Sequence, residues 1–361
     1  MIICVHEDRI EHIAGLKLTL LSILRYRPDL SVFVSFPNSP PSLHSWLEAL
    51  PNTKLIDDPA LKGLGWNVKP TLLLYCLSKG YSDVVWIDAD IIINRDFKPF
   101  FSCLDEKTMV VAQEYYWGPK QEKNQRALTW DLKPGISLPA NVNSGVIRVT
   151  SCHKVLLENW QSLLNHPAYK LAQTKPTNDR PLAMIGDQEV LNALLSSDKF
   201  SHISLKMLKR GVEIAQCFKM AGYTPSERIK SLFVAPPYFI HAMGNKPWRR
   251  EKSPKVLWQK ETQFSQKAER YFNYIHQELT PYTAIARQYK NLLGEDTDWL
   301  NTKSIPAKLL TTLFFNHSIL QEFPLSIIES VSRRIYRFLG KDKNKYISDI
   351  SVKTYPLKDI S

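Results

Sequence analysis

Two aspartates lie two positions apart inside a long apolar run. Asp88 and Asp90 fall within residues 84–93, where the other side chains are valine, isoleucine, tryptophan and alanine. In a single extended strand both carboxylates would point to the same face, because side chains alternate between the two faces of a strand. Two like charges are costly in an apolar setting unless a cation neutralises them, and carboxylate oxygens suit Mg²⁺ or Mn²⁺. We therefore expect a metal site here; the alternative is a strand that ends at Asp88, with both acids in a solvated turn.

Three later segments also combine polar side chains with glycine or proline. Their sequences are Asn143-Ser144-Gly145-Val146, Gly186-Asp187-Gln188-Glu189 and His241-Ala242-Met243-Gly244-Asn245-Lys246-Pro247-Trp248. Each segment alone has an explanation that needs no ligand. Asp187 can cap a helix, a common role for aspartate, and Asn143 can lie in a turn before a strand. His241 can be a structural histidine that follows a strand.

Helices and strands alternate over the first 250 residues, and these elements must position the polar side chains. Apolar runs rich in β-branched residues predict strands at 2–5, 31–36, 53–56, 84–93, 108–113, 145–149 and 238–242. Helical spacing predicts helices at 13–24, 42–50, 69–79 and 152–165, and another that begins at Asp187. Residues 114–140 and 167–181 predict loops. The alternation is typical of a doubly wound α/β fold with a mostly parallel sheet, in which ligands bind at the carboxyl ends of the strands.

Composition and charge narrow the class of protein. The 361 residues suffice for a large core, and the net charge of +12 favours an anionic partner such as a nucleotide or an anionic lipid. No nucleic-acid-binding motif is present, so we expect no nucleic acid as a partner. The five cysteines include no C-x-x-C pair, which favours reduced thiols in a cytoplasm. We expect neither a signal peptide nor a transmembrane helix, because no apolar run of 18 residues occurs.

Taken together and in this order, the four polar segments resemble the nucleotide-diphospho-sugar transferases of the GT-A fold. The similarity is greatest to the glycosyltransferase family 8 type, the glycogenin and bacterial galactosyltransferase kind. That family shows an Asp-x-Asp that ends a strand, then Asn-x-Gly, then Asp-Gln at the start of a helix, then His-x-x-Gly-x-x-Lys-Pro-Trp. In this chain the last motif has one residue fewer between Gly244 and Lys246. The resemblance covers residues 1–250 and implies a GT-A type, nucleotide-sugar-binding catalytic domain.

The resemblance also implies a role for each segment. Asp88, Asp90 and His241 would hold the metal, and this mixed donor set favours Mn²⁺ over Mg²⁺. Asp187 and Gln188 would be the catalytic residues beside the donor sugar. The residues expected to bind the donor are His6, Asp8, Lys69, Asp88, Asn143, Ser144, Gly145, Gly244 and Lys246. Two of these keep a plain alternative, since Lys69 could be a solvated residue at a helix start and Lys246 could lie in a surface turn.

Residues 251–361 have a different character and read as a helical, basic C-terminal extension. Leucine, isoleucine and phenylalanine form apolar stripes between 306 and 339, and arginines and lysines cluster from Arg333 to Lys345. Such helices could lie on an anionic membrane surface. The alternative is that they pack on the catalytic domain as ordinary helices. Trp66 and the aromatic residues of 115–130 are candidates for the acceptor side, although core packing explains them equally well.

These observations predict a metal-dependent glycosyltransferase that uses a nucleoside-diphosphate sugar, with a UDP-sugar favoured. The resemblance implies retention of anomeric configuration and a glycan or lipid-linked acceptor, in the cytoplasm or at the inner face of the membrane. Inversion stays open, because Asp187 or Glu189 could act as a general base. The alternatives are a degenerate transferase or basic binding module without catalysis, and a sugar nucleotidyltransferase. The last needs a glycine-rich phosphate loop after the first strand, where this chain has His-Glu-Asp-Arg.

Overall fold

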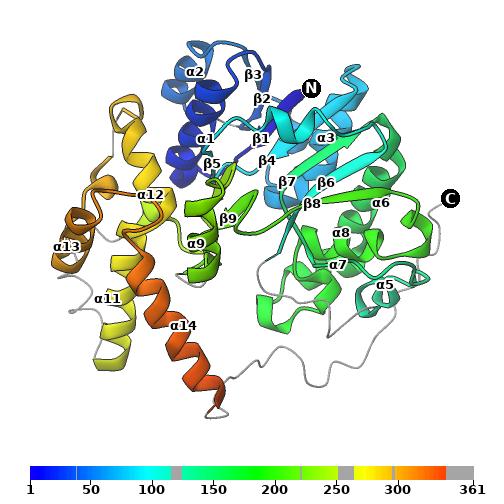
Figure 1. Ribbon diagram of the computed structural model, residues 1–361. Coiled ribbons are helices and arrows are strands. Elements are labelled where there is room, and N and C mark those ends of the chain that lie inside the picture. Colours follow the sequence, from blue (N-terminus) through cyan, green and yellow to red (C-terminus); the bar gives the residue numbers. More distant parts are fainter. Residues whose placement is uncertain (38, 115–123, 220–221, 251–263, 295–296, 339–361) are drawn as a thin grey trace.

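The main sheet has seven strands in the order β3-β2-β1-β4-β7-β6-β8 (Figure 1). The computed structural model describes all residues except 38, 115–123, 220–221, 251–263, 295–296 and 339–361. The seven strands are β1 (Ile2–His6), β2 (Val32–Ser35), β3 (Thr53–Ile56), β4 (Asp83–Ile87), β6 (Thr108–Gln113), β7 (Val142–Thr150) and β8 (Ser204–Leu208). Only β7 runs antiparallel to its two neighbours, and the other four pairings are parallel. The predicted mostly parallel sheet is therefore confirmed.

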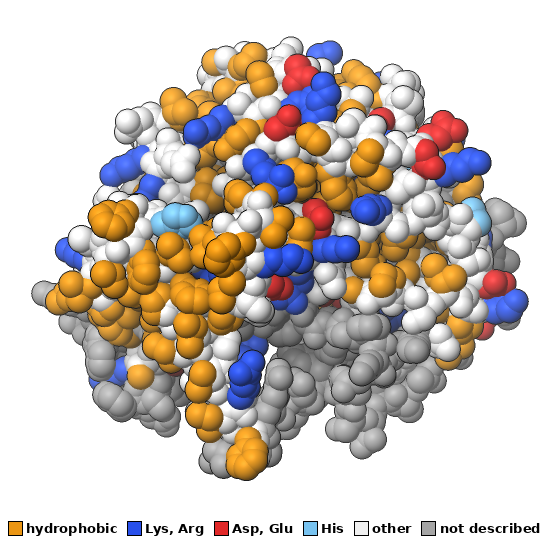
Figure 2. Space-filling model, viewed as in Figure 1, with side chains coloured by type: hydrophobic (Ala, Val, Ile, Leu, Met, Phe, Trp, Pro, Cys, Tyr) orange, Lys and Arg blue, Asp and Glu red, His pale blue; other side chains and the backbone are white. Residues whose placement is uncertain are grey.

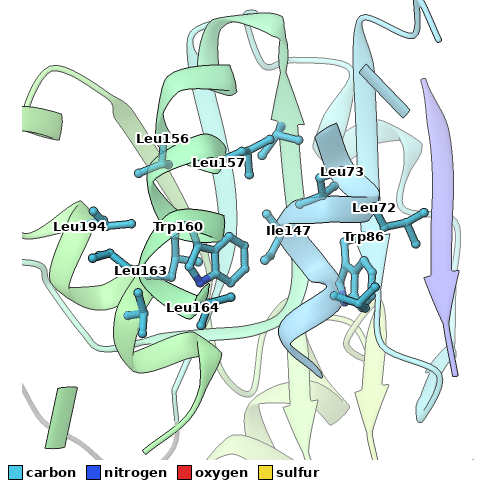
Figure 3. Packing of buried hydrophobic residues seen from close by; sticks show 14 of the residues in the cluster. Leu72, Leu73, Trp86, Ile147, Leu156, Leu157, Trp160, Leu163, Leu164 and Leu194 are labelled. Carbon is cyan, nitrogen blue, oxygen red and sulfur yellow. The ribbon is translucent and has the colours of Figure 1, made fainter. Parts of the chain in front are cut away.

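Helices cover both faces of this sheet, as expected for a doubly wound fold. Alternate residues of each inner strand face opposite sides, so that Val84 and Trp86 join one core cluster while Val85 and Ile87 join the other. The first cluster is completed by α3 (Lys69–Ser78), α6 (Lys154–Asn165) and α8 (Asp187–Leu195), and Figure 3 shows Trp86 and Trp160 packed among its leucines. The second is completed mainly by α1 (Ile13–Tyr26), α2 (Pro41–Glu48) and α4 (Lys98–Phe101).

The predicted single strand at 84–93 is wrong, because this run belongs to two different sheets. β4 ends at Ile87, and after a turn β5 (Ile91–Ile93) pairs antiparallel with β10 (Phe239–His241). β10 also pairs with β9 (Ile214–Gln216), which completes a second sheet of three strands. Asp88 and Asp90 therefore lie in the turn that connects the two sheets. Apolar runs reveal burial but not the sheet to which each half of the run belongs.

Several short elements lie where the sequence predicts loops. α5 (Gln125–Thr129) lies in the stretch predicted as a loop at 114–140, and α7 (Pro167–Gln173) begins the loop predicted at 167–181. Two features explain how this polar segment starts a helix. Proline occupies the first position of α7, and the His166 ring accepts a hydrogen bond from the backbone N–H of Ala168. β8, β9 and α9 (Pro225–Phe233) have no counterpart among the predicted elements.

Among the described residues after 263 are four α-helices, of which α12 shares a core with the sheets while the other three pack together in a separate cluster. They are α11 (Phe264–Leu279), α12 (Pro281–Ala286), α13 (Ile305–Leu313) and α14 (Phe323–Phe338). Tyr282, Ile285 and Trp299 are buried in one cluster with Leu18 of α1 and Ile92 of β5. Within the described part of the chain, no helix is long and apolar enough to cross a membrane.

A buried ionic network also joins these helices to α9. The Arg228 guanidinium of α9 and the His276 ring of α11 both contact the Glu322 carboxylate, and all three side chains are buried. Burial opposes ionisation of Glu322, but His276 and Arg228 outweigh it and lower the pKa of that carboxyl. The network therefore needs all of its members, since removing one partner leaves a buried charge uncompensated.

We predict that Glu322→Gln destabilises the protein by about 3–5 kcal/mol at neutral pH, because Arg228 loses its counter-charge in the interior. The Glu322 carboxyl has a lower pKa in the folded state than in the unfolded state. Its contribution to stability is therefore fully present at pH values above its unfolded-state pKa and is lost as the pH falls through its folded-state pKa. Urea denaturation at several pH values should therefore show that the variant loses less unfolding free energy on acidification than the wild type does. Glu329→Gln is the matched control, as its partner Arg333 is partly exposed on the same helix. Equal destabilisation by the two variants would contradict the prediction.

Candidate active site

The turn between the two sheets brings three metal-ligand side chains together. Asp88 and Asp90 flank the turn, and His241 ends β10 beside it. Two backbone bonds fix the turn, from Asp88 N to the carbonyl of Gly145 at 2.8 Å and from Ala242 N to the carbonyl of Asp90 at 3.0 Å. One donor atom from each of the three side chains lies within 4.8 Å of the others. The structure thus places the three predicted ligands in one cluster.

The donor atoms of this cluster are suited to a divalent cation. His241 Nε2 lies 3.2 Å from Asp90 Oδ1 and 4.0 Å from Asp88 Oδ2. Asp90 Oδ1 and His241 Nδ1 are buried and have no hydrogen-bond partner among the described residues. Apart from the His241 ring 3.2 Å away, Asp90 Oδ1 has no partner among the described side chains, and a cation would compensate this buried oxygen. The alternative is right that the strand ends here and that both acids lie in a turn, but the turn is largely buried, with 25% of the Asp88 side chain and 14% of the Asp90 side chain exposed.

Lys246 contacts the same cluster from the loop that follows β10. Its ammonium group contacts Asp90 Oδ2 and donates a hydrogen bond to the Ala242 carbonyl at 2.7 Å. Burial opposes ionisation of Asp90, but the charges of Lys246 and His241 outweigh it and lower the pKa of the carboxyl. Asp90 is therefore ionised at neutral pH, which is the state that a metal ligand requires.

Lys69 is the second cation of the site, and it is buried. As the first residue of α3 it donates a hydrogen bond to Ser144 Oγ at 2.6 Å, and its Nζ lies 3.3 Å from Asp88 Oδ1 and 3.2 Å from Asp187 Oδ2. Burial would lower the pKa of Lys69, but Asp187 and Asp88 outweigh it and raise that pKa. The alternative of a solvated residue at a helix start is therefore wrong.

Asp187 receives its other support from β7. It lies in the first turn of α8 and accepts a hydrogen bond from Ser144 Oγ at 2.8 Å. Burial raises the pKa of Asp187, and Lys69 and Ser144 partly offset that rise. The helix-cap alternative does not describe it, because its carboxylate is engaged with β7 and α3 rather than with the free N–H groups of α8.

Next to Asp187 lies a cluster of amide and carboxylate side chains. Asn143 Nδ2 donates to Glu114 Oε2 at 2.9 Å and to Gln188 Oε1 at 3.3 Å, and Gln188 Nε2 donates to Glu114 Oε2 at 3.1 Å. Asn143 lies inside β7, so the alternative of a turn before the strand is wrong. Glu114 was not predicted as a site residue, although its position directly after β6, at a sheet edge, is a usable signal. Glu189 forms an ion pair with Arg126, and Arg126 was not predicted as a site residue either.

Two glycines are explained by the geometry of the cluster. A Cβ at Gly145 would lie 2.8 Å from His241 Cε1 and 2.9 Å from Asn143 Oδ1, so the absence of a side chain lets the imidazole approach β7. Gly244 has φ +71°, in the left-handed region that glycine enters readily, and a Cβ there would also meet the Phe218 ring at 2.9 Å. Gly145 therefore positions His241, and Gly244 allows the turn that leads to Lys246.

A cleft of about 880 Å³ opens over this centre. The expected donor-binding residues that line it are His6, Asp8, Lys69, Asp88, Gly244 and Lys246, and Trp66 lies there too. Asp8 Oδ2 accepts a hydrogen bond from Gly65 N at 3.2 Å, and His6 Nδ1 bonds with Ser35 Oγ at 2.9 Å. The lining does not include Asn143, Ser144, Gly145, Asp187 or Gln188, which lie on the far side of Lys69. The aromatic residues at 115–117 lie outside the described residues.

The loop that carries Lys246 rests on aromatic residues from distant parts of the chain. The Trp248 ring lies 5.8 Å from the ring of His12, 5.7 Å from that of Tyr282 and 6.1 Å from that of Trp299, between ring centroids. At Gly15 of α1 a Cβ would meet the same indole at 2.7 Å. Residues that follow position 263 thus support the loop from behind.

A doubly wound sheet with an acidic turn, a histidine and two lysines at one cleft is typical of enzymes that bind a phosphorylated ligand through a metal. The chain belongs to the nucleotide-diphospho-sugar transferase family, whose sequence profile matches residues 62–255. It is a glycosyltransferase of the GT-A fold, as the sequence resemblance implied. The matched residues include all of those discussed from Lys69 to Trp248. No curated protein sequence matches the chain.

Several solved glycosyltransferase structures are similar to this chain. The galactosyltransferase LgtC, in complex with donor and acceptor sugar analogs, has 16% identity over 70% of this chain and 90% of its own, with a TM-score of 0.44. GlyE from Streptococcus pneumoniae has 15% identity over 81% of this chain and 64% of its own, with a TM-score of 0.42. Mouse xyloside xylosyltransferase 1 has 14% identity over 67% of this chain and 97% of its own, with a TM-score of 0.42.

We predict that Gly145→Ala weakens Mn²⁺ binding by about tenfold or more, because the new methyl group displaces the His241 ring from the two aspartates. Titration of Mn²⁺, followed by the electron paramagnetic resonance of the free ion, measures this affinity. Gly186→Ala is the matched control, since a Cβ at Gly186 meets no atom within 4 Å. Unchanged Mn²⁺ affinity in the folded Gly145→Ala variant would show that His241 is not held by this contact.

Proposed function

We propose that the protein transfers a sugar from a UDP-sugar to a glycan or lipid-linked acceptor with a bound Mn²⁺, or Mg²⁺ in its place. The observation that carries this proposal is the cluster of Asp88, Asp90 and His241 beside Lys246, of which the two aspartates and the lysine line the cleft. His6 and Asp8, at the end of β1, would form the edge that binds the nucleoside. Their place in the cleft supports this assignment.

Departure of the sugar leaves negative charge on the nucleoside diphosphate. A cation held by Asp88, Asp90 and His241 would stabilise that charge electrostatically. Lys246 has the reach to contribute as well, because its ammonium group already lies among these ligands and lines the cleft. Lys69 instead lies between Asp88 and Asp187 and fixes both side chains in place, which preorganises the site before the substrate binds.

The donor sugar would lie beyond Lys69, against Asp187, Gln188 and Asn143. Their oxygens and amide groups suit sugar hydroxyls. We further propose that the reaction retains anomeric configuration. Both carboxylates that could act as the base of an inverting reaction are buried against cations, Asp187 against Lys69 and Glu189 against Arg126.

We predict that UDP-sugars raise the melting temperature only in the presence of Mn²⁺ or Mg²⁺. At a ligand concentration 100 times Kd, the free energy of unfolding should increase by about 2.7 kcal/mol. A thermal-shift comparison of UDP- and GDP-sugars, with and without metal, makes the measurement. Asp90→Asn should abolish both the shift and sugar transfer. Asp198→Asn, in an exposed ion pair with Lys133, is the control and should behave as wild type. Metal-independent transfer would contradict the proposal.

The second part of the proposal is that the C-terminal helices contact the inner face of a membrane peripherally. Large apolar side chains are exposed on α9, α13 and α14 and directly after the ends of α9 and α13, and they form what we term the apolar surface. Its residues are Ile229, Leu232, Phe233, Val234, Ile305, Leu309, Leu313, Phe315, Ile327, Ile328, Val331, Ile335 and Phe338. Figure 2 shows hydrophobic side chains gathered over these helices. Packing inside the protein therefore accounts for only part of the stripes: Ile319 is buried with residues of α1 and β5, and Leu325 with residues of α11 and α13.

The charge around the apolar surface supports an anionic bilayer as its partner. Lys230, Lys308 and Arg334 are exposed on the same three helices, and α13 contains no acidic residue. Amphipathic helices with basic polar residues bind at the interface of anionic membranes through apolar burial and electrostatic attraction. The basic residues from Lys341 to Lys345, which the sequence analysis also assigned to this contact, lie outside the described residues.

We predict that the wild type floats with phosphatidylcholine vesicles that contain phosphatidylglycerol, and much less with phosphatidylcholine alone. The double variant Leu309→Glu, Phe315→Glu should lose most of this binding, because it places charges at two highly exposed apolar positions. Leu171→Glu is the matched control, being 63% exposed on α7, away from the apolar surface. Absence of flotation together with dimerisation in size-exclusion chromatography would instead assign the surface to a second copy of the chain.

A further inference from the structure

One wall of the cleft is formed by α11, which lies beyond the residues that the family profile matches. Arg270, Asn273, Tyr274 and Gln277 of this helix all line the cleft. Their spacing of three and four residues places them on one face of the helix. We term this set the polar face of α11.

The polar face of α11 belongs to the nucleotide end of the cleft rather than to the sugar end. The same cleft is lined by Asp8, Gly65 and Trp66, and by Lys246 beside the metal ligands. Asp187 and Gln188, the residues proposed for the donor sugar, are not part of its lining. A ligand that contacts both the metal cluster and α11 would therefore present its nucleoside diphosphate portion to the helix.

The chemistry of the polar face is suited to such a ligand. Asn273 and Gln277 are half-buried amides, each with donors and acceptors that can read the polar edge of a base or a ribose. Arg270 can add a charge-assisted bond to a phosphate. The Tyr274 hydroxyl is buried at the cleft wall and has no hydrogen-bond partner among the described residues. A buried hydroxyl of this kind is expected to have a partner, and a bound ligand would supply one.

The opposite face of α11 holds the helix rigidly against the rest of the chain. Ile275 and Leu279 pack with Ala307 of α13 and Leu325 of α14. Glu278 is fully buried, accepts hydrogen bonds from Ser304 and lies 3.4 Å from the Arg250 guanidinium. That guanidinium also lies 4.8 Å from the centroid of the Tyr274 ring. Binding groups on so fixed a helix are preorganised, which reduces the entropic cost of binding.

We propose that the polar face of α11 binds the nucleoside diphosphate portion of the donor and contributes to the choice of its base. This inference rests on the proposed function, because it places the donor nucleotide in the cleft. It assigns a role in donor selection to the C-terminal extension, separate from any contact of α13 and α14 with a membrane.

Isothermal titration of the full-length protein with UDP and with GDP, in the presence of Mn²⁺, tests the proposal without any need for an acceptor. Asn273→Ala and Gln277→Ala should each weaken binding of the preferred nucleotide about five- to tenfold, as expected for lost hydrogen bonds. They should also change the ratio of the UDP and GDP affinities. Tyr274→Phe, which removes only the unpartnered hydroxyl, should weaken binding severalfold with unchanged thermal stability.

Gln266→Ala is the matched control, because Gln266 is an exposed amide on the same helix outside the cleft lining. It should bind nucleotide as the wild type does. If the wild type binds UDP or GDP with Mn²⁺ but the polar-face variants bind it equally well, the inference is wrong and the proposed function stands. A rise in the KM for acceptor with unchanged nucleotide affinity would also overturn it. If the wild type binds no nucleotide with metal present, both the inference and the proposed function fail.

Discussion

One buried ammonium group holds the candidate active site together. Lys69 lies between the carboxylates of Asp88 and Asp187, which come from different elements and would repel each other without it. Both acids and the lysine are costly to remove from water, so the arrangement is stable only while all three are present. Because Lys69 begins α3, Asp88 follows β4 and Asp187 begins α8, the relative placement of these three elements depends on this contact.

The hydrophobic core extends this constraint to the rest of the catalytic domain. Trp86 and Trp160 belong to the same buried cluster, and each indole N–H donates to the site: Trp86 to Asp88 Oδ1 at 2.7 Å and Trp160 to the Asp187 carbonyl at 3.0 Å. A shift in the packing of α6 or of β4 would therefore move Asp187 or Asp88 directly. The polar centre and the apolar core are joined through the tryptophans, which have both an apolar body and a polar tip.

Much of this architecture could be predicted from local sequence, and the failures have physical causes. The order of most strands and helices followed from apolar periodicity. The spacing of Asp88 and Asp90 in an apolar run predicted a metal site, whereas His241 and Lys246 were assigned through the resemblance of the four motifs to the transferase family. The division of residues 84–93 between two sheets depends on which partner strands are available, and that is decided by β7 and β10 far along the chain. Glu114 directly follows a predicted strand, which is a local signal, whereas the polar face of α11 reaches the cleft only through tertiary packing, which no local pattern encodes.

The packing of Trp248 bears on how such a chain could diversify. Its indole is shared between the loop that carries Lys246 and the aromatic residues Tyr282 and Trp299 of the C-terminal region. The two regions therefore do not behave as interchangeable modules, although the family profile ends at residue 255. A recombinant that joins this catalytic segment to another C-terminal region must also supply aromatic partners for Trp248. Without such partners, exchange at this boundary would change the surroundings of Lys246 as well as the extension itself.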